Sequence, residues 1–295
     1  MSDSASPSPS VLVIGAGELG TAVLDALVKH PKRQSGKISV LLRQSSIESQ
    51  DADKKKNVDR IRSLRVGLEA GDFCAGYGFP AGTGVRTTRA AIEVGISRFF
   101  PFQFGVDYDA IGEGNSQGLF DEMLEVRKLL RGQDKTGWTI VSTGLFVSYL
   151  FLPGFGIVDF KEHVVRALGT WDTSVTVSTL EAIGTMVAEV VYVPGDIMNQ
   201  VVYIGGETIS YRRLADLVEA TYQVPFKREV WDVASLKKIL EDNPDDLFAR
   251  YRVVFGAGIG VAWDMDKTLN RQRGIPLANV GDFVRANKES IGSQT

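Results

Sequence analysis

The fold of this chain follows from residues Val11–Gly20, which read VLVIGAGELG. Four apolar residues lead directly into Gly15, Gly17 and Gly20, and these have the GxGxxG spacing. The first glycine of such a motif makes a tight turn after a buried strand. The second lets the backbone approach a diphosphate, and the third lets the next helix pack closely on the strand. The stretch therefore predicts a dinucleotide-binding strand, turn and helix.

The sequence around the motif supports this prediction. Apolar residues recur at helical spacing after the turn, and Pro31 ends the run because it lacks an N–H group. Glu18 and Leu19 are expected cofactor contacts, since the N–H groups and dipole at a helix start attract phosphate. Ile38–Leu42 then reads as a second buried strand. A glycine-rich turn in another kind of α/β protein is the alternative, but it does not explain why these signals coincide.

Arg43 ends the second strand, where a protein that selects NAD usually carries Asp or Glu to bind the ribose 2′-hydroxyl. A guanidinium group instead suits a 2′-phosphate, to which it can donate two parallel hydrogen bonds. The Ser45 hydroxyl can add a further donor. The alternative is that Arg43 is a solvated cation at a strand end. We predict that NADP(H), rather than NAD(H), is the cofactor.

Composition limits the class of protein. The chain has 295 residues, of which 44% are hydrophobic and 23% charged, with a net charge of −3. This is typical of a globular enzyme, and an acidic chain is poorly suited to bind nucleic acid. One cysteine and two histidines make a disulfide or a metal site improbable, so no metal is expected.

The N-terminus and the apolar runs of the chain bear on its location in the cell. Residues 1–9, MSDSASPSP, are rich in Ser and Pro and predict a disordered tail rather than a secretory signal. No uninterrupted apolar run approaches the roughly 20 residues that a membrane helix needs. We expect a cytoplasmic protein that has no membrane partner.

The segment after the third predicted strand is unusually short. Leu64, Val66 and Leu68 alternate as that strand, and the helix that closes at Gly95 follows almost at once. A doubly wound domain should place a helix and a fourth strand between them. Either Cys74–Phe79 retains a remnant of strand four, with Phe79 beside the cofactor, or the strand is absent.

Two later strands should bring loops to the cofactor. SRFFPF at 97–102 and WTIVST at 138–143 read as buried strands. Ligands of open α/β sheets bind at the carboxyl ends of the strands. Gln103 and Phe146 are therefore expected cofactor contacts. Phe104, Phe146 and Tyr149 are expected to line a substrate pocket.

The domain organisation follows from a change of pattern near residue 150. Residues 10–150 predict an NADP-binding Rossmann domain, a doubly wound parallel sheet that is abbreviated around strand four. Residues 151–295 predict a smaller α+β substrate domain, some segments of which return to the Rossmann sheet. The chain is compatible with a homodimer that acts on a small molecule.

Several motifs together resemble a known family. GAGELG, Arg43, SRFFPFQFGVDYD, LFDEMLEVRKLL and WTIVSTGLF are similar to the NmrA-like atypical short-chain dehydrogenases. The most similar branch is the isoflavone reductase-like one, including fungal and bacterial members known as aromatic alcohol reductases. The resemblance implies a Rossmann domain that binds NADP, a smaller carboxyl-terminal substrate domain and hydride transfer between them.

The chain departs from the plant members at three points. One is the short segment before Phe79, a stretch that supplies a wall of the cofactor site in those members. The other two concern the substrate pocket, in which the resemblance places Met123. Those reductases carry a lysine as general acid/base four residues before an arginine, and here Arg127 sets the register and Met123 holds the lysine position. A thioether cannot donate a proton usefully. Their PSEFG motif reads PFQFG here, so Phe102 and Gln103 should make the pocket more apolar.

The proton donor and the reaction remain open at this level. Tyr108 and Asp121 are the candidate catalytic residues, with Asp109, Glu122 or water as alternatives, and an iminium substrate would need no proton. The first hypothesis is an NADPH-dependent reductase of an aromatic or alkaloid-like molecule in secondary metabolism. The others are an NADP-binding isomerase or cyclase without net redox chemistry, and a non-catalytic NADP(H)-sensing regulator.

Overall fold

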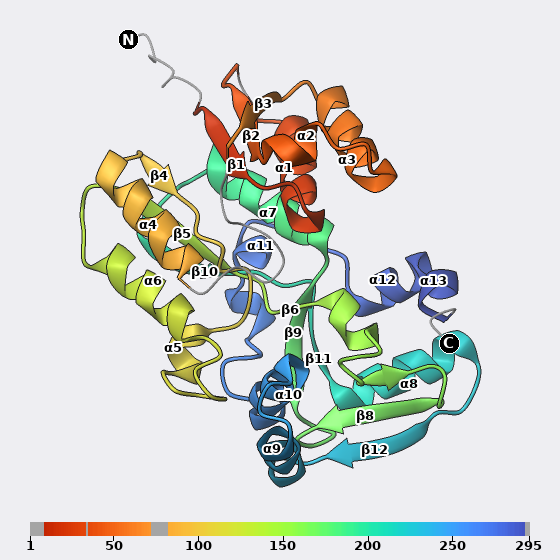
Figure 1. Ribbon diagram of the computed structural model, residues 1–295. Coiled ribbons are helices and arrows are strands. Elements are labelled where there is room, and N and C mark those ends of the chain that lie inside the picture. The colour runs from red at the N-terminus through yellow and green to blue at the C-terminus, as the bar shows by residue number, and fades with distance from the viewer. Residues whose placement is uncertain (1–8, 34, 72–81, 293–295) are drawn as a thin grey trace.

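A computed structural model describes residues 9–33, 35–71 and 82–292 (Figure 1). Residues 1–8 of the predicted tail, Phe79 and the predicted strand remnant at Cys74–Phe79 lie outside the described residues.

The first half of the chain alternates strands and helices. Its elements are β1 (Val11–Ile14), α1 (Glu18–Lys29), β2 (Ile38–Leu42), α2 (Gln44–Ile47), α3 (Ala52–Ser63), β3 (Gly67–Ala70), α4 (Thr83–Val94), β4 (Arg98–Phe99), α5 (Tyr108–Ile111), α6 (Asp121–Arg131), β5 (Gly137–Ser142) and β6 (Leu145–Phe146).

The second half has shorter strands and more helices. Its elements are the 3-10 helix η1 (Val147–Phe151), β7 (Val158–Asp159), β8 (Val164–Leu168), β9 (Ser174–Ser178), α7 (Leu180–Tyr192), β10 (Gln200–Tyr203), β11 (Glu207–Ser210), α8 (Tyr211–Tyr222), β12 (Lys227–Trp231), α9 (Val233–Asp242), α10 (Leu247–Ala257), the 3-10 helix η2 (Met265–Lys267), α11 (Leu269–Gln272), α12 (Val280–Ala286) and α13 (Lys288–Gly292).

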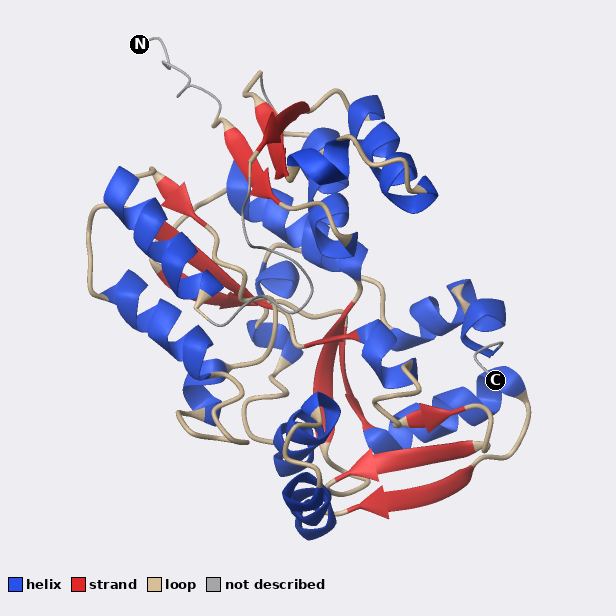
Figure 2. Ribbon diagram, in the orientation of Figure 1, coloured by secondary structure: helices blue, strands red, loops and turns tan. Residues whose placement is uncertain are grey.

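The first half of the chain, together with β10, forms two parallel three-stranded blocks (Figure 2). One has the order β1-β2-β3 and the other β10-β5-β4, and every pair in both is parallel. β10 comes from beyond residue 150, so the later chain returns to this sheet. Helix α1 packs along α7, and α4 packs along α6. This is the doubly wound α/β arrangement that the glycine motif predicts.

In the part of the chain that the structure describes, no strand pairing joins β1 to β4. Within residues 9–33, 35–71 and 82–292, β1 pairs only with β2, and β4 pairs only with β5. Leu12 and Ile14, on one face of β1, are 54% and 39% exposed, although strands of a parallel sheet are normally covered on both faces. One side of β1 thus has no strand partner among the described residues.

The third strand begins later than the sequence predicts. Leu64 is still bound to α3 as its C-terminal cap, since its N–H group donates to the Arg60 carbonyl, and the helix ends there because Arg65 adopts a left-handed φ of 56°. β3 therefore starts only at Gly67.

The second half forms its own apolar core. β9 lies between β6 and β11, while β8 lies between β7 and β12. Helices α8 and α10 pack against β8, and Phe155, Phe255 and Tyr211 are fully buried among them. Most of the aromatic side chains of this half are core rather than pocket.

Candidate dinucleotide-binding site

The three glycines of the GAGELG motif differ in what explains the choice of glycine at each position. Gly15 has a φ of +85°, which side chains rarely adopt. A Cβ atom on Gly20 would lie 2.3 Å from the Gly15 carbonyl oxygen, so α1 can approach β1 only with glycine there. Gly17 has an ordinary φ of −69°, and nothing lies within 4 Å of the position of its Cβ. Neither backbone conformation nor packing explains a glycine at 17, whereas a ligand close to the backbone does.

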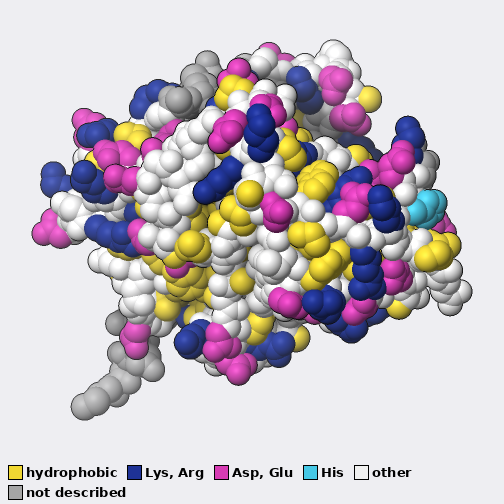
Figure 3. Space-filling model, turned by 90° about the horizontal axis from the view of Figure 1, so that it is seen from below, with side chains coloured by type: hydrophobic (Ala, Val, Ile, Leu, Met, Phe, Trp, Pro, Cys, Tyr) yellow, Lys and Arg dark blue, Asp and Glu magenta, His cyan; other side chains and the backbone are white. Residues whose placement is uncertain are grey.

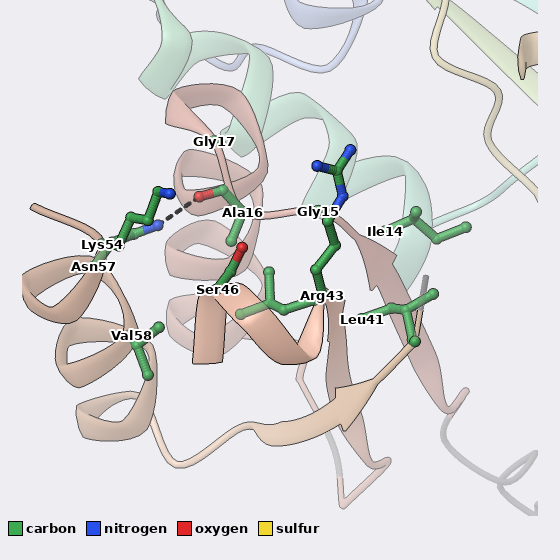
Figure 4. A pocket seen from close by; sticks show the side chains of 12 residues that line it. Ile14, Gly15, Ala16, Gly17, Leu41, Arg43, Ser46, Lys54, Asn57 and Val58 are labelled. Carbon is green, nitrogen blue, oxygen red and sulfur yellow. Dashed lines mark hydrogen bonds between the residues drawn. The ribbon is translucent and has the colours of Figure 1, made fainter. Parts of the chain in front are cut away.

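A cavity of about 230 Å³ adjoins this turn (Figure 4). Gly15 and Gly17 form one side, Arg43 and Ser46 lie where β2 ends and α2 begins, and Lys54 comes from α3. Three of the predicted contacts, Gly15, Gly17 and Arg43, thus line the same cavity.

The other predicted contacts near the turn lie differently. Ser45 is exposed and does not line the cavity, because the turn into α2 places its neighbour Ser46 there instead. Glu18 and Leu19 form the first turn of α1, outside the residues that line the cavity, and Gly20 packs beneath Gly15.

The charges around the cavity suit an anion. Arg43 and Lys54 place two cations on its lining. The N-terminal end of α1 lies beside them, and Gly17, its capping residue, supplies no side-chain hydrogen bond to the first turn. The first N–H groups of a helix need such partners, and phosphate oxygens can provide them.

Loops from β4 and β5 meet as expected from the strand order. The Gly105 carbonyl accepts hydrogen bonds from the N–H groups of Thr143 (2.8 Å) and Gly144 (3.0 Å). The loop after β4 is therefore fixed to the carboxyl end of β5.

The four predicted pocket residues are all partly buried. Phe104 and Phe146 pack against the apolar cluster around β1 and β2. Met123 and Tyr149 pack against the apolar core of the second half. The rings of Phe146 and Tyr149 meet edge to face at 6.2 Å. Through this ring contact, Phe146 and Tyr149 bring one member of each apolar cluster together.

Gln103 lies beneath the loop rather than on its surface. It is 1% exposed, its amide donates to the Met123 carbonyl at 2.8 Å, and its oxygen accepts from Arg127 Nε at 2.9 Å. The loop after β4 is thus joined to α6 by a side chain whose polar atoms are already bonded within the protein.

Arg127 has a structural role that the sequence analysis did not predict. It is fully buried, and it donates to Asp109 at 2.6 Å while its guanidinium lies over the Tyr108 ring at 5.0 Å. Asp109 also accepts two hydrogen bonds from Arg131. A lone arginine on the apolar face of the helix around 119–130 was the available signal, because a buried charge must be paired.

Tyr108 and Asp121, the two candidate catalytic residues, are both engaged elsewhere. Tyr108 is 6% exposed, packs on Phe120, and has its hydroxyl against Gly105. Burial raises the pKa of this phenol, so it retains its proton. Asp121 is exposed in the first turn of α6 and accepts the Gly114 N–H at 2.9 Å. Neither residue lines the cavity at the glycine turn.

Other kinds of site find little support in the part of the chain that the structure describes. No group of three or more His, Cys, Asp or Glu side chains there can hold a metal ion. Among the same residues no helix combines the length and apolarity needed to cross a membrane. Basic and acidic side chains are interspersed on the face shown in Figure 3.

Comparison with known proteins identifies the family. The model of the NmrA-like family matches residues 80–268. A Gibberella moniliformis protein named NmrA-like family domain-containing oxidoreductase is 45% identical over 298 residues, which cover 94% of this chain and 98% of that protein. The chain belongs to the NmrA-like family. The alignment is 298 positions long, which is more than the number of residues of this NmrA-like chain that it covers. Some residues of the relative therefore have no counterpart here.

Solved structures confirm the predicted fold of this NmrA-like protein. An isoflavone reductase has a TM-score of 0.78 at 16% identity, covering 95% of this chain and 99% of its own. The NADPH-dependent quinone oxidoreductase QOR2 from Escherichia coli, complexed with NADPH, has a TM-score of 0.72 at 16% identity over 94% of this chain and 99% of its own. Both share the Rossmann-like α/β architecture.

Proposed function

We propose that this NmrA-like chain is an NADPH-dependent reductase of a planar aromatic or alkaloid-like small molecule that carries a carbonyl, enone or imine. One observation carries the proposal: open space lies over Gly17, beside Arg43 and Lys54. A diphosphate bound at a Rossmann turn would occupy that space. The two cations would then lie beside the 2′-phosphate of the adenosine ribose. The NADPH complex of the quinone oxidoreductase supports the same choice of cofactor.

The residues present fit NADPH, which supplies a hydride when bound. The backbone from Gly15 to Gly17 and the start of α1 would hold the diphosphate. Arg43, Ser46 and Lys54 would hold the 2′-phosphate, with the guanidinium forming the stronger, paired hydrogen bonds.

The proposed substrate site is apolar. Phe104, Met123, Phe146 and Tyr149 offer rings and a thioether, which suit a flat aromatic molecule. Two structural relatives are named for isoflavone and quinone chemistry, and both of these are flat, conjugated carbonyl compounds. A place in secondary metabolism is consistent with such a substrate.

We propose water as the proton source rather than Tyr108 or Asp121. Met123 has no proton to give, and the Gln103 amide is occupied by α6. Reduction of a carbonyl takes a hydride from NADPH and a proton from water, and reduction of an iminium cation takes the hydride alone. Tyr108→Phe and Asp121→Asn should therefore retain turnover.

The test is the loss of NADPH absorbance with a quinone, an isoflavone and a cyclic iminium as substrates. Oxidation of NADPH with formation of one equivalent of reduced product supports a reductase. Product formed without NADPH oxidation would instead indicate an isomerase or cyclase. A protein partner retained with only one redox form of the nucleotide, without turnover, would indicate a sensor.

A further inference from the structure

Helix α3 contacts the glycine turn through one side chain. Asn57 Nδ2 donates to the Ala16 carbonyl at 2.7 Å, as the dashed line in Figure 4 shows. The Thr21 hydroxyl, on α1, lies 3.3 Å from the same carbonyl. Ala16 and Thr21 are both buried, and Asn57 is partly buried. The central peptide of the turn is thus held from two helices.

This contact fixes the direction of a backbone donor. A peptide is planar and almost always trans, so the orientation of the Ala16 carbonyl determines that of the Gly17 N–H. A carbonyl oxygen also carries partial negative charge, which would repel a diphosphate nearby unless a donor engaged it. The Asn57 amide meets both requirements.

The same helix carries one of the cations of the cavity. Lys54 and Asn57 are three residues apart, so they lie on one face of α3, and both line the cavity. Buried Val58 and Ile61 anchor the helix, and Arg60 forms an ion pair with Asp25 of α1. α3 therefore connects the side chain suited to a 2′-phosphate with the backbone suited to a diphosphate.

We infer that Asn57 is a positioning residue for the dinucleotide: its amide orients the Ala16–Gly17 peptide and couples the turn to the Lys54 end of the cavity. This rests on the proposed NADPH function. Asn57 acts on the diphosphate that NADPH and NADH share, whereas Lys54 acts on the 2′-phosphate that only NADPH carries.

Binding of NADPH and NADH to Asn57→Leu, Lys54→Ala and the double variant tests this, with Lys56→Ala as an exposed control on the same helix. We expect Asn57→Leu to weaken both nucleotides by about five- to thirtyfold. Lys54→Ala should weaken NADPH alone by about tenfold. In the Asn57→Leu background, loss of Lys54 should cost less than in the parent, because α3 no longer holds the turn.

Asn57→Asp separates orientation from simple packing. Its carboxylate would face the Ala16 carbonyl without a proton to donate, and protonation would restore the donor. NADH affinity of this variant should rise toward the parent value as the pH falls from about 7 to about 4, whereas Asn57→Leu should show no such recovery. NADH is used because it lacks the titrating 2′-phosphate.

Two results overturn the inference alone: unchanged affinity of Asn57→Leu for both nucleotides, or strictly additive losses in the double variant. A parent protein that binds NADPH and NADH equally contradicts the proposed NADPH function instead, and the shared effect of Asn57 on both nucleotides is then still measured. A parent that binds neither nucleotide overturns both.

Discussion

At the scale of single residues, we expect Gly17 to matter for nucleotide binding and Gly20 for stability. Gly17→Ala should leave the free energy of unfolding within about 1 kcal/mol of the parent, because its Cβ meets open space and its φ is ordinary. The same change should weaken NADPH binding by about tenfold or more, since the methyl group occupies the ligand's space. Thermal denaturation and nucleotide titration measure the two effects.

Gly20→Ala is the matched control. Its Cβ would lie 2.3 Å from a backbone oxygen, so α1 must shift, at a cost of about 2 kcal/mol or more. If Gly17→Ala bound NADPH as tightly as the parent does, the open space over that glycine would have no ligand to explain it.

Asp109 gives stability a defined dependence on pH. Hydrogen bonds from Arg131, and then from Arg127, lower its pKa from 3.8 to about 2 against the opposing effect of burial. A depressed carboxyl pKa stabilises the fold above the ordinary value, and that contribution is lost as the pH falls toward the folded-state value. Asp109→Asn should therefore be less stable than the parent near neutral pH.

The stability difference between Asp109→Asn and the parent should shrink as the pH falls from 3.8 toward 2. Urea denaturation at several pH values measures it. A constant difference over that range would mean that the carboxylate contributes nothing through its charge.

At the scale of elements, β1 should tolerate changes that a central strand normally does not. Leu12 on β1 is 54% exposed, whereas Val40 on the adjacent β2 is fully buried. Leu12→Ala should cost less than about 1 kcal/mol of unfolding free energy, and Val40→Ala about 2 kcal/mol or more. Chemical denaturation of both variants checks this. A loss at Leu12 equal to that at Val40 would show that β1 is covered on both faces in solution.

Elements were predictable where a local pattern specifies them. The strand at 38–42 and the strand at 164–168 agree with β2 and β8, and Arg43 lies beside the glycine turn because it directly follows β2. The positions of Ser46, Gln103 and Arg127 were harder to predict from the sequence. Ser45 and Ser46 differ only in the direction of a short helical turn, and Gln103 meets Arg127 through tertiary packing across 24 residues.

At the scale of the whole molecule, helix packing joins the two blocks of strands where the described residues show no strand pairing between them. No strand in the described ranges joins the β1-β2-β3 block to the β4-β5-β10 block. α1 instead lies along α7, where His30 contacts Glu189 at 3.1 Å, and Arg273 donates to the same carboxylate at 2.9 Å. The sequence indicated a shortened segment after residue 71. It could not indicate the contacts that hold the first block, because they join residues about 160 positions apart, which no local pattern connects.

The most direct test of the account is a titration of the unmodified chain and of Arg43→Ala with NADPH and NADH. The unmodified chain should bind NADPH at least about tenfold more tightly than NADH. Arg43→Ala should lose about ten- to a hundredfold in NADPH affinity, because charge-assisted hydrogen bonds to the 2′-phosphate contribute roughly 1.5 to 3 kcal/mol, while NADH binding stays unchanged. Equal binding of the two nucleotides by the unmodified chain would contradict the account.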